Sequence, residues 1–122
     1  MTEHLKDKTY KLMEELDTLK EYYLSHEPPD SKNDKHFFLM VKKQTKATYQ
    51  LLEDWEEVAL RLVKERKVNV HPQQITSTRE NMELLLLHSY YVDVKRKRYM
   101  EMNHSILYVF NQLLRDLVKH HA

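Results

Sequence analysis

Residues 37–62 read FFLMVKKQTKATYQLLEDWEEVALRL, and the spacing of the side chains in this stretch decides the fold class. One row recurs every four and then three residues: Phe37, Val41, Gln44, Thr48, Leu51, Trp55, Val58 and Leu62. This is the spacing of one face of an α-helix, held over nearly four heptads. The pattern predicts a long amphipathic helix over about residues 34–66, with Trp55 in the core. We expect an irregular turn near residues 33–36, because a helix that began at Ser31 would be much longer than the others.

Three further segments carry the same kind of stripe and predict three more helices. Their ranges are about 3–25, 73–91 and 94–119, with stripes at Leu5, Leu12, Leu16, Leu19 and Tyr23, then Ile75, Met82, Leu86 and Tyr90, then Tyr99, Met102, Ile106, Val109, Leu113 and Leu117. Proline-containing segments separate the first three helices, and Asp93 is expected to cap the last. Because the connections are short, successive helices should run in opposite directions. The sequence thus predicts an all-α protein, an antiparallel up-and-down four-helix bundle that forms a single domain over residues 1–122.

The composition excludes several classes of function. The chain has no cysteine and therefore no disulfide, thiolate metal site or cysteine nucleophile, which also suits a reducing compartment. It has no glycine, and phosphate-cradling loops need glycine to approach their ligand closely. The net charge of +1 gives no general field that attracts nucleic acid or an anionic membrane, and neither a membrane span nor a signal peptide is visible. We therefore expect a cytoplasmic protein that binds no nucleic acid and no membrane.

Several short motifs resemble a known family. They are HPQQITSTREN at residues 71–81 with the leucine run and SYY at 89–91 after it, RY at 98–99, and SILYV at 105–109. Together with Trp55 and its apolar neighbours, they make residues 35–118 similar to the YppE-like family of small bacterial proteins. The resemblance implies a four-helix up-and-down bundle. It brings no catalytic, metal-binding or cofactor-binding residue with it.

Glu101 and His104 form a Glu-x-x-His pair, the unit that di-iron bundles place on two of their helices. A single copy is present, and on a helix it lies nearly opposite the stripe of the fourth segment, so both side chains should face water. The chain has eight histidines, and none forms an i, i+4 pair with a third ligand close in the sequence. We therefore expect no metal, no cofactor and no catalytic residue.

Gln44 and Thr48 are polar positions within the apolar stripe of the second predicted helix. Inside a bundle, such side chains usually bond a neighbouring tyrosine or determine the register of the helices. The alternative is that they orient a small ligand or a metal bound between the helices.

Leu84, His88 and Tyr91 step by four and three along the side of the third helix that lies away from its stripe. The basic run that begins at Lys95 follows just beyond a short turn. The candidate interaction surface consists of Leu84, His88, Tyr91, Lys95, Arg96 and Arg98, because an apolar centre with a charged rim is typical of protein-binding surfaces. The alternative is that the third helix buries this side too, since a bundle helix has two neighbours. The sequence thus predicts a protein-interaction or structural module without catalytic activity, whose partner is another protein or a second copy of the chain.

Overall fold

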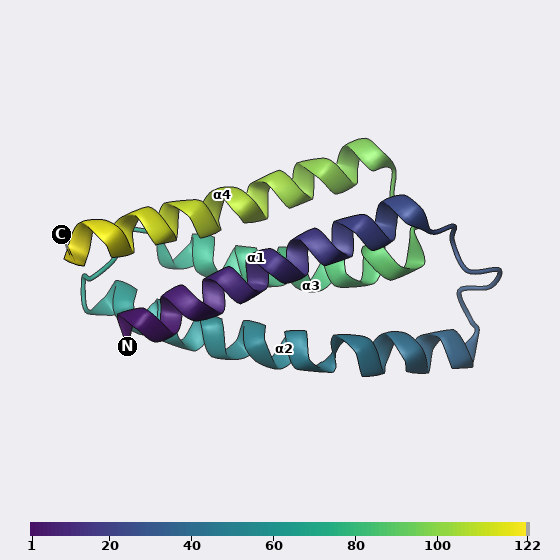
Figure 1. Cartoon of the computed structure of the whole chain (residues 1–122), viewed down its shortest axis with the longest axis horizontal. Helices are drawn as coiled ribbons and strands as arrows, with labels where there is room; N and C mark the ends of the chain where they lie inside the picture. Colours follow the sequence, from purple (N-terminus) through teal and green to yellow (C-terminus); the bar gives the residue numbers. More distant parts are fainter. Residues whose placement is uncertain (122) are drawn as a thin grey trace.

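The computed structural model describes the backbone of residues 1–121 and the side chains of residues 1–118. Four helices follow one another: α1 (Thr2–Ser25), α2 (Lys35–Lys64), α3 (Pro72–Tyr91) and α4 (Arg96–His121). They make 82% of the chain helical, and no strand occurs in the described residues. Each helix runs opposite to the one before it (Figure 1). The predicted all-α four-helix bundle is confirmed.

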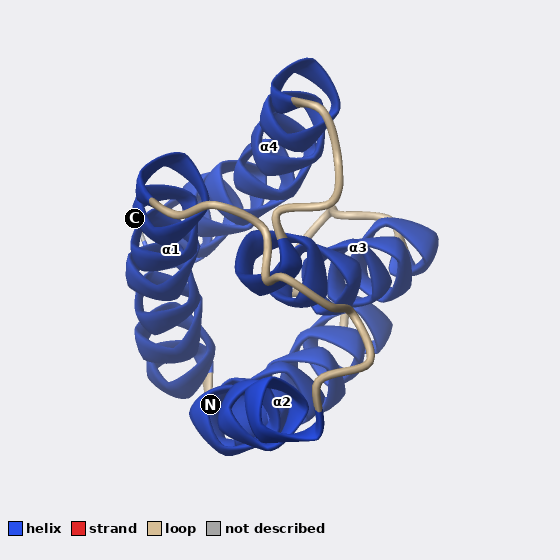
Figure 2. Ribbon diagram, turned by 90° about the vertical axis from the view of Figure 1, so that its right-hand side faces the viewer, coloured by secondary structure: helices blue, strands red, loops and turns tan. Residues whose placement is uncertain are grey.

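α1 and α3 lie between the other two helices. Each of them lies beside all three other helices, whereas the backbones of α2 and α4 do not approach each other closely within the described part of the chain. Seen end-on, α2 and α4 are at opposite sides of the bundle (Figure 2). A core cluster with residues from all four helices fills the space between them. It contains the stripes predicted for α1, α3 and α4, apart from Tyr90 and Met102, which are half-buried at its edge.

α2 begins and ends with motifs that do not need glycine. The Asp34 carboxylate accepts hydrogen bonds from the backbone N–H groups of the second and third helical residues, at 2.9 and 3.2 Å. This cap follows a turn at residues 32–33, which is the irregular stretch expected before the helix. At the other end, Arg66 takes a left-handed conformation with φ 60°, and the backbone N–H groups of residues 65, 66 and 67 bond the carbonyls of the last turn.

The connection between α3 and α4 differs from the prediction. α4 begins at Arg96 rather than near residue 94, and Asp93 is not its cap. Val92 takes a left-handed conformation, and both Val92 and Val94 pack against the core. The Asp93 carboxylate between them is partly buried and lies 2.7 Å from the Nδ1 atom of His88. Burial of the two valines therefore decides the path of this turn and delays the start of α4.

The inward face of α2 is rotated slightly from the predicted one. The anchors of the seven-residue period are buried as expected, at Val41, Thr48, Trp55 and Leu62. The buried positions between them each lie one residue later than predicted, at Thr45, Leu52 and Ala59. Gln44 is exposed, so its predicted place in the stripe is wrong, whereas Leu51 and Val58 are half-buried at the edge of the core.

Trp55 anchors α2 in the core. Its side chain is completely buried, and its ring meets that of Phe110 of α4 edge-on, with ring centroids 5.4 Å apart. The indole N–H donates a hydrogen bond to Thr9 Oγ1 at 3.0 Å, and the Thr9 hydroxyl donates in turn to the Leu5 carbonyl at 2.7 Å. The polar atom of the largest core side chain is therefore satisfied inside the bundle. The predicted core position of Trp55 is confirmed.

Tyr99 forms a second polar cluster near the other end of the core. Its buried hydroxyl lies 2.6 Å from Ser89 Oγ, which donates to the Leu85 carbonyl at 2.6 Å, so the tyrosine is the donor to the serine. The ring stacks on that of Tyr23, with centroids 3.9 Å apart. Burial raises the pKa of Tyr99 to about 12, because a phenolate there would lose its hydration.

This pKa gives the bundle a specific alkaline weakness. The unfolded chain releases the Tyr99 proton near pH 10, whereas the folded chain holds it to about pH 12, so stability that is present below pH 10 falls as the pH rises between these values. We expect a loss of about 2–3 kcal/mol from Tyr99 across this window. Urea unfolding at pH 9 and pH 11.5 measures it. The Tyr99→Phe variant should lose less stability between the two pH values than the native chain, and an equal loss in both proteins would contradict the prediction.

Candidate functional site

The outward face of α3 carries two exposed leucines. Leu84 is 50% exposed and Leu87 is 41% exposed, whereas Leu85 and Leu86 between them are buried. At roughly 100° per residue, the two exposed leucines are about 60° apart around the helix and lie on one surface. Leu84 is therefore exposed, as the candidate interaction surface requires, and is not buried against a neighbouring helix.

His88 and Tyr91 lie on the same face, but each already has a contact within the chain. His88 is bonded to Asp93, as described above. Tyr91 is half-buried, and its ring meets that of Phe37 edge-on, with centroids 5.0 Å apart. These contacts join the last turns of α3 to the following connection and to the start of α2. Because of these contacts, less of the surface of His88 and Tyr91 is free to contact a partner than the sequence pattern predicts.

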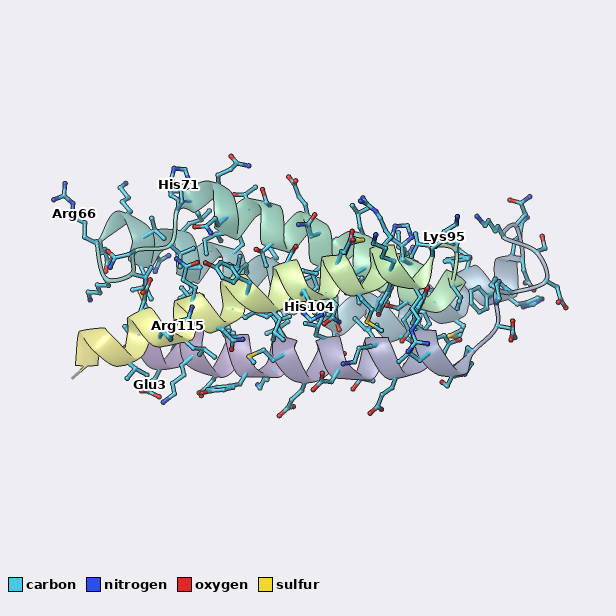
Figure 3. All side chains as sticks on the ribbon, turned by 90° about the horizontal axis from the view of Figure 1, so that it is seen from above. Glu3, Arg66, His71, Lys95, His104 and Arg115 are labelled. Carbon is cyan, nitrogen blue, oxygen red and sulfur yellow. The ribbon has the colours of Figure 1, made fainter. Side chains whose placement is uncertain are left out.

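The basic residues of the candidate surface lie at one end of the bundle. Lys95, Arg96 and Arg98 are exposed where α4 begins, at the position that Figure 3 marks with Lys95. None of the three is in an ion pair with the residues that the structure describes. Leu84 lies about 10 Å along α3 from Tyr91 and shares a shallow pocket with Tyr49 of α2. Leu84, the apolar part of the predicted surface, thus lies on the side of α3 next to α2. It is separated from the basic run at the start of α4.

A groove of about 610 Å³ lies between α2 and α3, next to the exposed leucines. Buried or half-buried side chains line it from α2, namely Val41, Thr45 and Tyr49. Leu87 lines it from α3, and the exposed Phe38 lies among its lining residues. This α2–α3 groove and the outward leucines of α3 form one continuous surface, because Tyr49 and Leu87 belong to both.

A network of charges crosses the groove at one end. Arg79 of α3 donates a hydrogen bond to Glu56 of α2 at 2.8 Å and lies 3.5 Å from Glu83. The hydrogen bond to Glu56 is the main reason that the pKa of Arg79 is raised above its ordinary value. The partly buried ion pair holds α2 and α3 together at this end.

The proposed polar layer inside the bundle does not form as predicted. Gln44 is exposed on the surface of α2. Thr48 is buried, and its hydroxyl donates a hydrogen bond of 3.4 Å to Glu15 Oε2 of α1. The two side chains therefore do not meet around a common ligand position.

Glu101 and His104 are both exposed, as the helical spacing predicts; Figure 3 labels His104 midway along α4. Among the residues that the structure describes, no group of three or more histidine or acidic side chains is placed to hold a metal ion. The side chains of His120 and His121 lie outside the described residues. No described helix is long and apolar enough to cross a membrane.

Comparison with known proteins identifies the family. Residues 9–117 match the model of a family described as a bacterial domain of unknown function, DUF1798. The chain belongs to this family. It is 30% identical over 94 residues to the uncharacterized protein YppE of Bacillus subtilis, covering 74% of this chain and 76% of that protein. The resemblance inferred from the sequence motifs is therefore confirmed.

Two solved structures of the Bacillus subtilis protein have the same fold. Its crystal structure has a TM-score of 0.84 at 25% identity, covering 98% of this chain and 96% of that one. Its solution NMR structure has a TM-score of 0.78 at 22% identity, covering 97% and 95%. The agreement over nearly the whole length shows that all four helices belong to the family fold.

Sequence reasoning missed the α2 side of the surface. Leu87 was treated as part of a leucine run, and the exposed Phe38 and Leu39 were placed within the helix without a role. A signal was present, because Phe38, Lys42, Tyr49 and Glu53 recur at helical spacing on one flank of α2. The sequence pattern does not show, however, that α4 leaves this flank of α2 uncovered.

Proposed function

We propose that the chain is a non-catalytic protein-interaction module whose partner binds the outward face of α3. The observation that carries this proposal is the exposure of Leu84 and Leu87 beside the α2–α3 groove. Burial of apolar surface contributes about 25 cal/mol per Å², so a partner that covers adjacent leucines gains free energy that isolated surface residues do not provide. Charged side chains from both helices surround this apolar centre, as in the rim of a protein interface.

A ligand or metal bound between the helices is the weaker alternative. Gln44, on which that function depended, faces solvent, and Thr48 is bonded to Glu15. The layer around Trp55 is closed by the ring of Phe110 and by the hydroxyl of Thr9. The exposed leucines have no role under this alternative, whereas a protein partner accounts for them.

We place this activity in the cytoplasm and assign a protein, not a nucleic acid, as the partner. A chain of 122 residues without cysteine suits a reducing compartment. Nucleic-acid binding depends on neutralising many phosphates, and a chain with 20 basic and 19 acidic residues offers no large excess of positive charge.

Site-specific photo-cross-linking in the native host tests the proposal. A photoreactive phenylalanine derivative at Leu84 should give a cross-linked product of discrete mass, because a partner covers this position. Leu24 of α1 is the matched control, since it is also a leucine and is 46% exposed, but it lies outside the proposed surface. The absence of a product from position 84, or the same products from both positions, would refute the proposed function.

A further inference from the structure

The charges along the open flank of α2 change sign at Tyr49. Lys42 and Lys46 line the α2–α3 groove before Tyr49, and Glu53 lines it after Tyr49. The wider sequence follows the same division, because residues 35–52 contain no acidic side chain and residues 53–57 contain no basic one. The flank is therefore basic on one side of Tyr49 and acidic on the other.

α3 strengthens the acidic half of this surface. Glu80 and Glu83 lie around the shallow pocket that Tyr49 shares with the two exposed leucines. With Glu53 and Glu56 of α2, they make four carboxylates against the single guanidinium of Arg79, which leaves a charge of about −3. The basic half carries +2 from two exposed lysines that form no ion pair within the described residues.

The two halves lie at matching distances from Tyr49. At about 1.5 Å per residue, Lys46 lies about 4.5 Å before Tyr49 along α2, and Glu53 lies about 6 Å after it. Lys42 and Glu56 each lie about 10 Å from Tyr49, on opposite sides. Consider a twofold axis that lies in the plane of the contact, passes close to Tyr49 and is perpendicular to the long direction of the groove. Rotation about this axis brings each basic half opposite an acidic half.

From this arrangement we infer that the partner of the surface is a second copy of the same chain, paired antiparallel about a twofold axis close to Tyr49. The inference rests on the proposed function, because it names the partner of the same surface. In such a pair, Leu84 and Leu87 of both copies meet at the centre, and the contact between lysines and carboxylates occurs twice. A purely acidic or purely basic partner fits less well, because either one would meet a half of its own sign.

Charge reversal tests the pairing in the purified chain. Sedimentation equilibrium at low ionic strength should show a dimer of the native chain, weakened as salt is added. The variants K42E/K46E and E53K/E80K should each weaken the dimer by at least about tenfold, because each places like charges opposite one another. Neither variant replaces Arg79 or its ion-pair partners Glu56 and Glu83, and circular dichroism checks that the helices remain. K11E/K64E changes the net charge by the same amount as K42E/K46E, on exposed residues outside the groove, and should leave the dimer unchanged.

A one-to-one mixture of the two reversed variants gives the decisive result. One variant is acidic along the whole flank and the other is basic, so the mixture should form a heterodimer about as readily as the native chain forms its homodimer. A monomeric native chain, a dimer that both reversals leave unchanged, or a mixture that does not associate would each overturn the inference. If position 84 cross-links to a different protein in the host while the purified chain is monomeric, this inference fails and the proposed function stands.

Discussion

Trp55→Ala is expected to lower the free energy of unfolding by about 3–5 kcal/mol, the range for removing a large buried aromatic side chain. The substitution leaves a cavity between α2 and α4, where the indole meets Phe110, and removes the hydrogen bond to Thr9. Typical domains of this size have 5–15 kcal/mol in total, so a substantial part of the stability is at stake. Urea unfolding followed by circular dichroism is the suitable measurement, because Trp55 is the single tryptophan and its fluorescence disappears with it.

Two control variants separate the contributions at this position. Trp55→Phe keeps an aromatic ring and removes the donor to Thr9, so it should cost less, about 1–3 kcal/mol. Tyr108→Ala removes an aromatic side chain that is 61% exposed, and it should change stability by less than about 0.5 kcal/mol. A loss below about 1 kcal/mol for Trp55→Ala would mean that this side chain is not packed as the structure has it.

The fold could be predicted because four segments repeat their apolar side chains at helical spacing. The spacing of apolar residues does not show which of two adjacent apolar residues faces the core. α2 is an example of this limit. Leu51 and Leu52 fit the spacing equally, and only the contact with α1 and α3 shows that Leu52 is the inner one. The start of α4 was missed for a similar reason, because Asp93 has the properties of a cap but the burial of its two valine neighbours controls the turn.

The candidate site was only partly predictable. Spacing placed Leu84 on the side of α3 away from the core stripe, because that inference needs only the geometry of one helix, but the sequence left open whether a neighbouring helix covers this side; in the structure Leu84 is exposed. The role of α2 depends on which helices are neighbours, and the sequence does not reveal that the backbone of α4 lies apart from that of α2. The change in the sign of the charges at Tyr49 is visible in the sequence. Only the structure shows that Leu87 and Glu83 of α3 lie beside Tyr49 and belong to the same surface.

The four consecutive leucines of α3 allow a direct test of this orientation. Leu85→Ala and Leu86→Ala should each lower the free energy of unfolding by about 2–5 kcal/mol, because both side chains are buried in the core. Leu84→Ala and Leu87→Ala should each change it by less than about 1 kcal/mol, since much of each side chain is already in water. The four substitutions are chemically identical, so helix propensity changes equally and cancels in the comparison. Urea unfolding at a protein concentration where the chain is monomeric measures all four.

The order of the four losses in the free energy of unfolding shows which side of α3 faces the core. Small, large, large and small losses along residues 84–87 mean that the inner face of α3 is centred on Leu85 and Leu86, and that the outer pair is free for a partner. A large loss for Leu84→Ala would mean that this side chain is buried in the monomer. That result is expected if α3 buries its outward side against a neighbouring helix as well. Because Leu84 is the centre of the proposed surface, that single result would remove the basis for both the interaction module and the dimer.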